Sequence, residues 1–225
     1  MPSLSTRALR ALLVLGAVLA AGLFLAAGTL DYWQAWVFLL AYLAPALALV
    51  LHLAKHSPEL LARRMRGGPL HEKQPVQKLI MSVVSVGFVA LILAPALERR
   101  FGWPQAPAAI ALMGDALVLL GWLAMFLVLR ENPWAASTIE VAKDQRVVSS
   151  GPYAIVRHPM YSGAFFLLLG IPLALGSLRG LLPLVLMLPA LVWRLLDEEK
   201  FLKKNLPGYA DYEKRVRWRL IPRFW

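Results

Sequence analysis

A compact group of polar side chains directly precedes an apolar run in the stretch SSGPYAIVRHPMYSGAFFLLLG, residues 149–170. The group comprises Arg157, His158, Tyr161 and Ser162, whose side chains can hold anions, transfer protons and donate hydrogen bonds. The residues that follow are apolar enough to begin a helix that enters a lipid bilayer. This juxtaposition predicts a ligand site at a membrane surface.

A proline sets the local backbone of this group. Pro159 disfavours a helical conformation at His158 and is itself well suited to the first position of a helix, so we expect a helix to begin at Pro159. Its free N–H groups, at residues 160–162, are expected to form an anion site beside His158 and Arg157. Gly163, one turn in, leaves space for a ligand across the helix start. The simpler alternative is a turn, with Arg157 as a headgroup anchor and His158 as a helix cap.

Arg194 and Glu198 form a second pair that could do chemistry. They are one helical turn apart at the end of an apolar run, so both project from one helix face. An exposed ion pair between them contributes only about 0.3–0.5 kcal/mol. An arginine near the bilayer centre costs about 2–3 kcal/mol, and less at the interface. This imbalance predicts a functional role for Arg194.

The composition is that of a membrane protein. The chain has 225 residues, of which 59% are hydrophobic and 16% charged, and its mean hydropathy is +0.61. The net charge of +11 is expected to face anionic lipid, and no nucleic-acid-binding motif accompanies it. The absence of cysteine excludes disulfides, thiol nucleophiles and thiolate metal sites. His52 and His56 are spaced like metal ligands but lack an acidic partner, so no metal site is predicted.

The hydropathy pattern predicts an all-α, polytopic transmembrane bundle in one domain. The expected spans cover about 9–28, 33–53, 79–97, 109–129, 161–176 and 181–196. The first could be a signal peptide, but the second begins so soon that a hairpin with Asp31 in its turn fits better. The last two spans are short and joined by GSLRG, and a helix is expected to continue out of the last one to Leu206, before Pro207 and Gly208.

The charges predict how the chain is oriented. The loop AKHSPELLARRMRGGPLHEKQPVQK, residues 54–78, is strongly basic and is therefore expected to be cytoplasmic. Counting spans from it places both termini, residues 130–160 and the tail from Asp197 on the same side. The two polar groups described above then share one membrane face.

The motifs GPYAIVRHPMYSG, RLLDEE and LPGYADYEKRVRWRLIP together resemble the isoprenylcysteine carboxyl methyltransferase family, and more distantly the phospholipid N-methyltransferases. The resemblance covers residues 137–225, whereas residues 1–136 carry no motif and are expected to be variable transmembrane helices. It implies a membrane methyltransferase that uses S-adenosylmethionine, with the cofactor enclosed by the last spans and a tail on the cytoplasmic face.

Site residues follow from the resemblance position by position. It implies cofactor contacts for Tyr153, His158, Pro159, Met160, Tyr161, Gly163 and Glu198, and a covering segment formed by Gln145, Arg146, Val147 and Val148. Arg194 corresponds to the arginine that holds the carboxylate of the acceptor, and with His158 it forms the expected catalytic pair. A glutamine found in some relatives is replaced here near Thr138.

The chemistry of the acceptor separates the remaining alternatives. The preferred acceptor is a prenylcysteine-type carboxylate entering from the bilayer, which is ionised at neutral pH and needs no general base. A phospholipid amine must first lose a proton, for which His158 and Glu199 are the nearby bases. The tail YEKRVRWRLIP is also similar to that of the membrane sterol reductases, which use NADPH. A membrane scaffold without activity is the last alternative.

Overall fold

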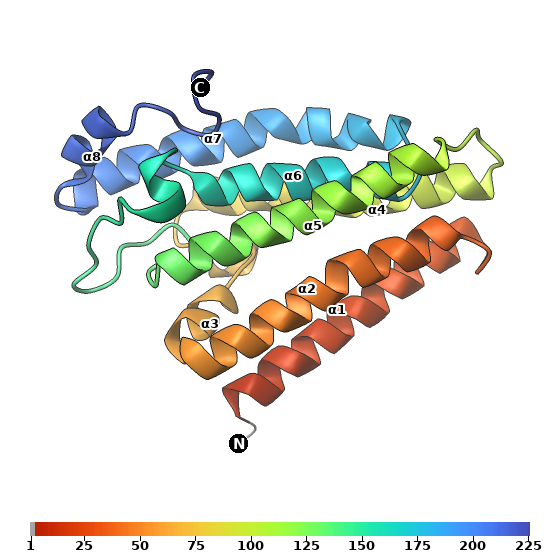
Figure 1. Cartoon of the computed structure of the whole chain (residues 1–225), viewed down its shortest axis with the longest axis horizontal. Helices are drawn as coiled ribbons and strands as arrows, with labels where there is room; N and C mark the ends of the chain where they lie inside the picture. Colours follow the sequence, from red (N-terminus) through yellow and green to blue (C-terminus); the bar gives the residue numbers. More distant parts are fainter. Residues whose placement is uncertain (1–2) are drawn as a thin grey trace.

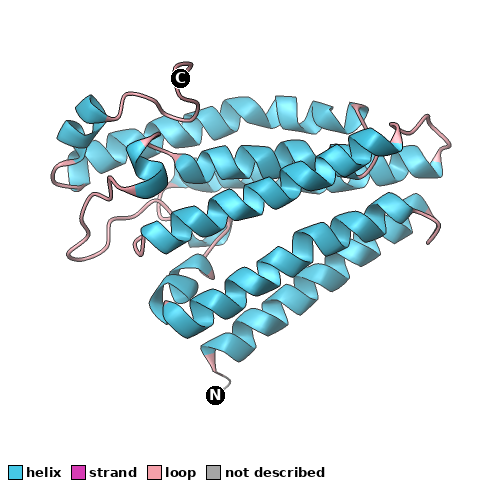
Figure 2. Cartoon of the chain, in the orientation of Figure 1, coloured by secondary structure: helices cyan, strands magenta, loops and turns pink. Residues whose placement is uncertain are grey.

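The structure, a computed structural model, describes residues 3–225, and every regular element within that range is helical (Figure 2). The long helices are α1 (Leu4–Ala27), α2 (Trp33–His56), α4 (Pro75–Arg100), α5 (Ala108–Glu131), α6 (Pro159–Ala174) and α7 (Leu182–Asn205). The short elements are α3 (Pro58–Arg64), α8 (Tyr209–Arg215) and the 3₁₀ turns η1 (Pro69–His71), η2 (Gly151–Ala154) and η3 (Arg179–Leu181). The predicted all-α fold class is confirmed.

Five of these helical segments are long and apolar enough to cross a membrane. They are α1, α2, α4, α5 and the segment Arg179–Asn205, which contains α7. The fifth predicted span, 161–176, corresponds to α6, which has only 16 residues. The predicted short helix is confirmed for α6. The last span, predicted for 181–196, continues without a break into the predicted tail helix, and together they form α7 with 24 residues.

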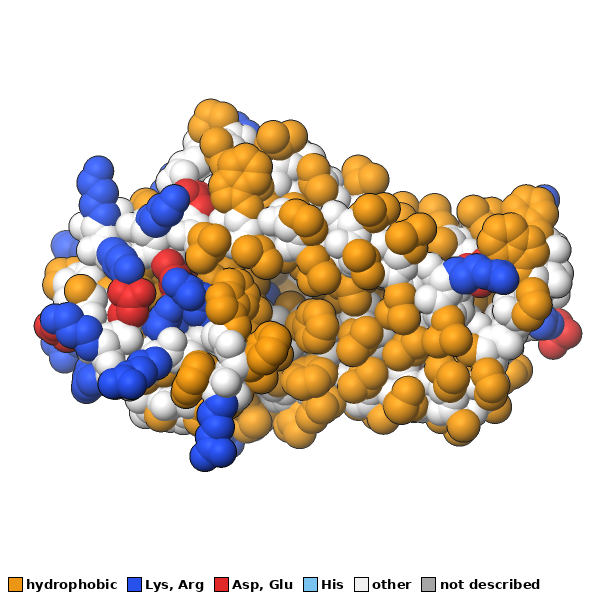
Figure 3. All heavy atoms as spheres, turned by 90° about the horizontal axis from the view of Figure 1, so that it is seen from above, with side chains coloured by type: hydrophobic (Ala, Val, Ile, Leu, Met, Phe, Trp, Pro, Cys, Tyr) orange, Lys and Arg blue, Asp and Glu red, His pale blue; other side chains and the backbone are white. Residues whose placement is uncertain are grey.

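The long helices lie side by side with alternating directions (Figure 1). The bundle end at which α2, α5 and α7 stop and α4 and α6 start is called the polar end below. It also carries α3 and α8, and the first described residues lie on the same side. Charged side chains gather at this end, with a smaller group at the other end and an apolar band between them (Figure 3). This distribution matches a bundle that spans a bilayer.

Prolines define the helix starts around the polar end. Pro58, Pro75 and Pro159 occupy the first turn of α3, α4 and α6, where the missing N–H costs no hydrogen bond. The helix start predicted at Pro159 is confirmed. The predicted end before Pro207 is also confirmed, because α7 stops at Asn205 with Leu206 as its cap.

The core holds α6 at the centre of the bundle. Leu23 of α1, Phe38 of α2, Leu91 of α4 and Ile171 of α6 are all completely buried in one apolar cluster. The packing of α1 and α2 into this cluster supports the predicted hairpin. A side chain at Gly121 of α5 would sit only 2.8 Å from backbone atoms of α6. Small residues thus bring α5 and α6 into close contact and fix the position of the α6 start.

Candidate active site

At the start of α6, fewer backbone N–H groups are free than predicted. His158 has φ −123° and ψ 60°, which is non-helical as expected. Its carbonyl oxygen, however, accepts hydrogen bonds from the amides of Tyr161 and Ser162 at 3.0 and 3.2 Å. The expected anion site built from the free amides of residues 160–162 is therefore wrong in this form, because two of the three amides are already bonded.

The C-terminal tail crosses this helix start. The amides of Arg157 and His158 donate to the carbonyls of Trp218 and Arg219 at 2.9 and 3.0 Å. The hydroxyl of Ser162 donates to the carbonyl of Leu220 at 2.8 Å. The tail thus satisfies backbone groups that the chain leaves free just before α6.

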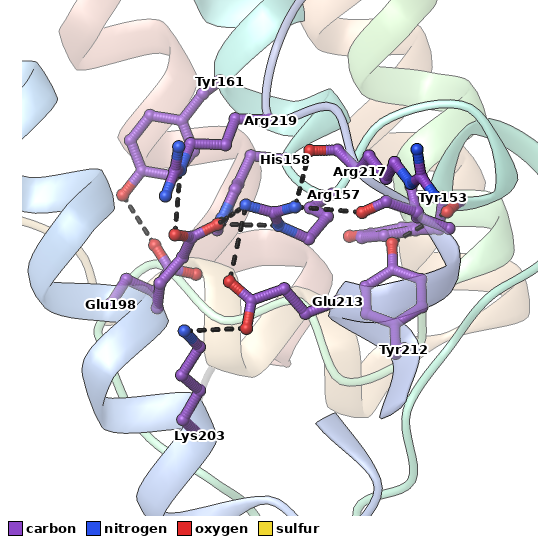
Figure 4. A network of polar contacts seen from close by, with 12 residues as sticks. Tyr153, Arg157, His158, Tyr161, Glu198, Lys203, Tyr212, Glu213, Arg217 and Arg219 are labelled. Carbon is purple, nitrogen blue, oxygen red and sulfur yellow. Dashed lines mark hydrogen bonds and ion pairs between the residues drawn. The ribbon is translucent and has the colours of Figure 1, made fainter. Parts of the chain in front are cut away.

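Glu199 is the centre of a buried ion cluster that joins the tail, α6 and α7 (Figure 4). Its carboxylate accepts from Nε of Arg157 at 2.8 Å, Nε2 of His158 at 3.2 Å and Nε of Arg219 at 2.9 Å. The side chains of Arg157 and Glu199 are only 3% and 4% exposed. Arg157 is therefore a structural cation rather than a headgroup anchor. Glu199, surrounded by three donors, cannot serve as the general base that the sequence allowed.

The same cluster fixes the histidine. A carboxylate only accepts hydrogen bonds, so Nε2 of His158 carries a hydrogen and Nδ1 is left for a ligand. His158 is buried and also lines a cavity at the polar end. Its position agrees with the predicted site, and its ring orientation is set by Glu199.

Tyr161 and Glu198 form a hydrogen-bonded pair beside the Glu199 cluster, away from Tyr153 and Tyr212 (Figure 4). The hydroxyl of Tyr161 donates to Oε2 of Glu198 at 2.7 Å. Both residues line the cavity. The second carboxylate oxygen of Glu198 has no hydrogen bond to another side chain in the described part of the chain, so it can accept one from a cationic ligand.

Arg194 has a different partner from the one its spacing indicated. Its Nη2 lies 2.7 Å from Oε1 of Glu72, and Nη1 donates to Oε1 of Gln77 at 2.7 Å. Nη2 also donates to the carbonyl of Ser137 at 3.2 Å. The simpler alternative, an ion pair between Arg194 and Glu198, is not present among the described residues, because the loop before α4 reaches Arg194 and the hydroxyl of Tyr161 is bonded to Glu198. No local pattern pointed to Glu72 or Gln77 as partners of Arg194, because both lie more than a hundred residues away along the chain.

The cavity at the polar end has a volume of about 420 Å³. Most of the predicted site residues line it: Gln145, Val147, Val148, Tyr153, His158, Pro159, Met160, Tyr161, Arg194 and Glu198. Thr138 lines it too. Along α6 it extends from Pro159 to Ile171, about 18 Å at 1.5 Å per residue. The deep part is apolar and includes Phe88 and Leu168, so the cavity joins a polar mouth to an apolar interior.

Two predicted cofactor residues do not line the cavity. Arg146 is not part of its wall. Gly163 faces α5 instead, where an added Cβ would lie 3.1 Å from Cβ of Ala124. The absence of a side chain at Gly163 therefore serves helix packing, and its predicted role in ligand approach is wrong.

Tyr153 is held from two sides at the cavity mouth. Its hydroxyl accepts from Nδ2 of Asn132 at 2.9 Å, and its carbonyl accepts from the hydroxyl of Tyr212 at 2.8 Å. Burial raises the pKa of Tyr153 to about 12, against the smaller lowering effect of the Asn132 hydrogen bond. The phenol is therefore neutral at physiological pH and acts as a hydrogen-bonding wall residue.

Comparison with known proteins supports the predicted class of protein, a membrane methyltransferase. Residues 109–207, from α5 to the end of α7, match the model of the phospholipid methyltransferase family. This is the more distant of the two families that the motifs resemble.

Two curated proteins are similar over part of their length. The cobalt-zinc-cadmium resistance protein CzcN of Cupriavidus metallidurans is 33% identical over 104 residues, 44% of this chain and 47% of CzcN. The nickel-cobalt-cadmium resistance protein NccN of Alcaligenes xylosoxydans xylosoxydans is 32% identical over 138 residues, 60% of this chain and 59% of NccN. The chain thus spans about half the length of the curated relatives it matches.

Proposed function

We propose that this protein is an integral membrane methyltransferase that moves a methyl group from S-adenosylmethionine to a lipophilic acceptor. The observation that carries the proposal is the cavity, in which Glu198, Tyr161 and His158 meet an apolar interior formed by membrane-length helices. The match of residues 109–207 to phospholipid methyltransferases supports the reaction class.

The residues present fit the cofactor. When bound, S-adenosylmethionine supplies a methyl group activated by a sulfonium. Glu198, held by Tyr161, offers a carboxylate oxygen to an ammonium group through a charge-assisted hydrogen bond. Val147, Leu202 and Leu206 provide apolar wall at the mouth and exclude water from that side. Tyr153 bounds the same region as a neutral hydrogen-bonding group.

For the acceptor we propose a carboxylate on a lipophilic chain, such as a prenylcysteine-type group. Methyl transfer is an in-line displacement, so the protein chiefly aligns the two reactants and excludes water. Arg194 has five N–H groups, and the partners Gln77, Ser137 and Glu72 do not use all of them, so the guanidinium can also orient an acceptor oxygen. The apolar interior along α6 is suited to the hydrocarbon part.

A phospholipid amine is the second candidate, favoured by the family that matches residues 109–207. An amine needs a base, and Nδ1 of His158 is the nitrogen available on the cavity wall. Glu199 cannot act as this base, because its carboxylate already accepts hydrogen bonds from Arg157, His158 and Arg219. The two candidates thus differ in whether His158 takes part in proton transfer.

Ligand binding and labelled methyl transfer test the proposal. We expect S-adenosylmethionine and S-adenosylhomocysteine to raise the melting temperature of the protein in detergent. At a ligand concentration a hundredfold above Kd, the free energy of unfolding should increase by about 2.7 kcal/mol. NADPH serves as the control for a reductase and is expected to have no effect. Labelled methyl should then pass from S-adenosylmethionine to a prenylcysteine analogue or to a membrane lipid extract. Stabilisation by NADPH alone would refute the proposal.

A further inference from the structure

Three arginines line the cavity, and their charge compensation is unequal. Arg157 is paired with Glu199, and Arg194 is paired with Glu72. Arg64, at the end of α3, forms no ion pair with a carboxylate anywhere in residues 3–225, although its neighbour Arg63 does. The cavity wall therefore carries one arginine whose charge the protein itself leaves uncompensated.

The guanidinium of Arg64 is held in place by neutral groups. Its Nη1 donates to the carbonyl of Ala136 at 3.2 Å and lies 3.4 Å from Sδ of Met160. Its own carbonyl accepts from the hydroxyl of Ser137 at 2.9 Å, so α3 and the segment after α5 are joined on both sides of the arginine. Burial lowers the pKa of Arg64 from its ordinary value, but an arginine stays charged at neutral pH. A partly buried cation without a counter-ion is costly unless a ligand supplies the anion.

Arg64 lies apart from Glu198, the carboxylate that fits the ammonium group of the cofactor. Arg64 belongs to α3, which lies beside α2, whereas Glu198 belongs to α7 on the far side of the polar end (Figure 1). Met160, which it contacts, packs with Leu60, Leu61 and Leu129 in a separate apolar cluster. Arg64 thus meets the cavity at the segment after α5 and at the first turn of α6.

We propose that Arg64 binds the anionic oxygen group of the lipophilic acceptor, either a carboxylate or the phosphate of a membrane lipid. This inference rests on the proposed function for the identity of the ligand as an acceptor. The two arginines then have different roles toward the acceptor. Arg64 supplies net positive charge that increases the affinity for the acceptor. Arg194, neutralised by Glu72, supplies directional hydrogen bonds that align the acceptor. Arg64 lies outside the segment that matches the methyltransferase family.

Paired probes with and without the anionic oxygen group test the assignment without turnover. N-acetyl-S-farnesylcysteine is compared with its neutral methyl ester, and phosphatidylethanolamine with diacylglycerol of the same chains. Affinities come from titrating each probe against thermal unfolding in detergent micelles. The wild type should bind the charged member of one pair about tenfold or more tightly, as expected for a hydrogen bond to a charged group. The pair that shows the difference identifies the anion.

Arg64→Gln should reduce that difference to less than about threefold, and Arg64→Lys should keep part of it because the charge remains without the planar fork. Arg63→Gln is the matched control, since Arg63 is the adjacent arginine of α3, is paired with Glu59 and does not line the cavity. It should leave the discrimination unchanged. S-adenosylhomocysteine affinity should stay within about twofold in all three variants, because the ligand of Arg64 is not the cofactor.

Three outcomes overturn the assignment. The wild type could discriminate in neither pair, Arg64→Gln could discriminate as well as Arg63→Gln, or Arg64→Gln could lose S-adenosylhomocysteine affinity instead, which assigns the anion to the cofactor. Failure of the proposed function looks different. In that case Arg64→Gln abolishes discrimination between the probes, while the wild type transfers no labelled methyl to either lipid class.

Discussion

Removing the carboxylate of Glu199 should destabilise the protein strongly and release the C-terminal tail. In Glu199→Gln, the two contacts of 2.8 Å from Nε and Nη2 of Arg157 lose their charged acceptor, and the other partners of Arg157 are two backbone carbonyls and a more distant Glu213 at 3.7 Å. Arg219 loses its 2.9 Å contact as well. The variant therefore leaves a buried guanidinium without a close counter-ion.

The size of the effect follows from burial. Breaking a buried ion pair by removing one partner costs about 3–5 kcal/mol, which applies to Arg157 and Glu199. The Arg219 contact adds less, about 0–1 kcal/mol, because that arginine side chain is 29% exposed. We therefore expect a loss of about 3–5 kcal/mol in Glu199→Gln, dominated by one pair. Replacing both members, as in Arg157→Met with Glu199→Leu, should cost less than the two single changes added together, because no unpaired charge remains.

Denaturation in detergent combined with limited trypsin digestion measures both consequences. Tail release should expose the bonds after Arg215 and Arg217 to trypsin in Glu199→Gln before the protein unfolds globally. Glu213→Gln is the control, since Glu213 is more exposed and lies 3.7 Å from Arg157. A loss below about 1 kcal/mol in Glu199→Gln, or a loss equal to that of the control, would show that the cluster is not the tail anchor.

Two further predictions concern the cavity and the orientation of the chain. Glu198→Gln should weaken S-adenosylmethionine binding about tenfold or more, because it removes a charge-assisted hydrogen bond. Arg194→Leu should leave cofactor affinity within about threefold. It should lower the turnover of a carboxylate acceptor about a hundredfold per folded molecule. Equal loss of cofactor binding in both variants would contradict the separate roles. We also propose that the polar end is cytoplasmic, so Leu70→Cys and Asn205→Cys, in a chain without native cysteine, should both be labelled by a membrane-impermeant maleimide from the cytoplasmic side only. Labelling from opposite sides would refute the shared face.

Local signals in the sequence predicted the helices and their ends around the site. Apolar runs located α1, α2, α4 and α5, and proline geometry placed the start of α6 at Pro159 and the end of α7 before Pro207. These features depend on residues close together in the chain, where hydropathy and backbone restrictions act directly. The motif around His158 likewise predicted five residues of the cavity wall: Tyr153, His158, Pro159, Met160 and Tyr161.

Charge partners could not be predicted in the same way. The one-turn spacing of Arg194 and Glu198 indicated an ion pair, but Arg194 is bound by Glu72 and Gln77, which approach it only in the folded bundle. A pair at this spacing gains too little to resist such a long-range partner. The space at Gly163 could not be interpreted correctly either. The sequence shows that a side chain is absent, but not that Ala124 of α5 lies beside this position.

The unequal lengths of α6 and α7 explain why the site lies at the polar end. With 16 and 24 residues, the two helices are about 24 and 36 Å long, so α7 extends about 12 Å further than α6. Residues 151–158, which form only the short 3₁₀ turn η2 and an extended segment, precede α6. Their backbone groups need partners wherever lipid excludes water. The tail supplies them at Arg157 and His158, and Glu199 anchors the tail. A shortened helix thus creates the polar layer, and the tail that satisfies this layer also closes the cavity in which Glu198 and His158 face the ligand.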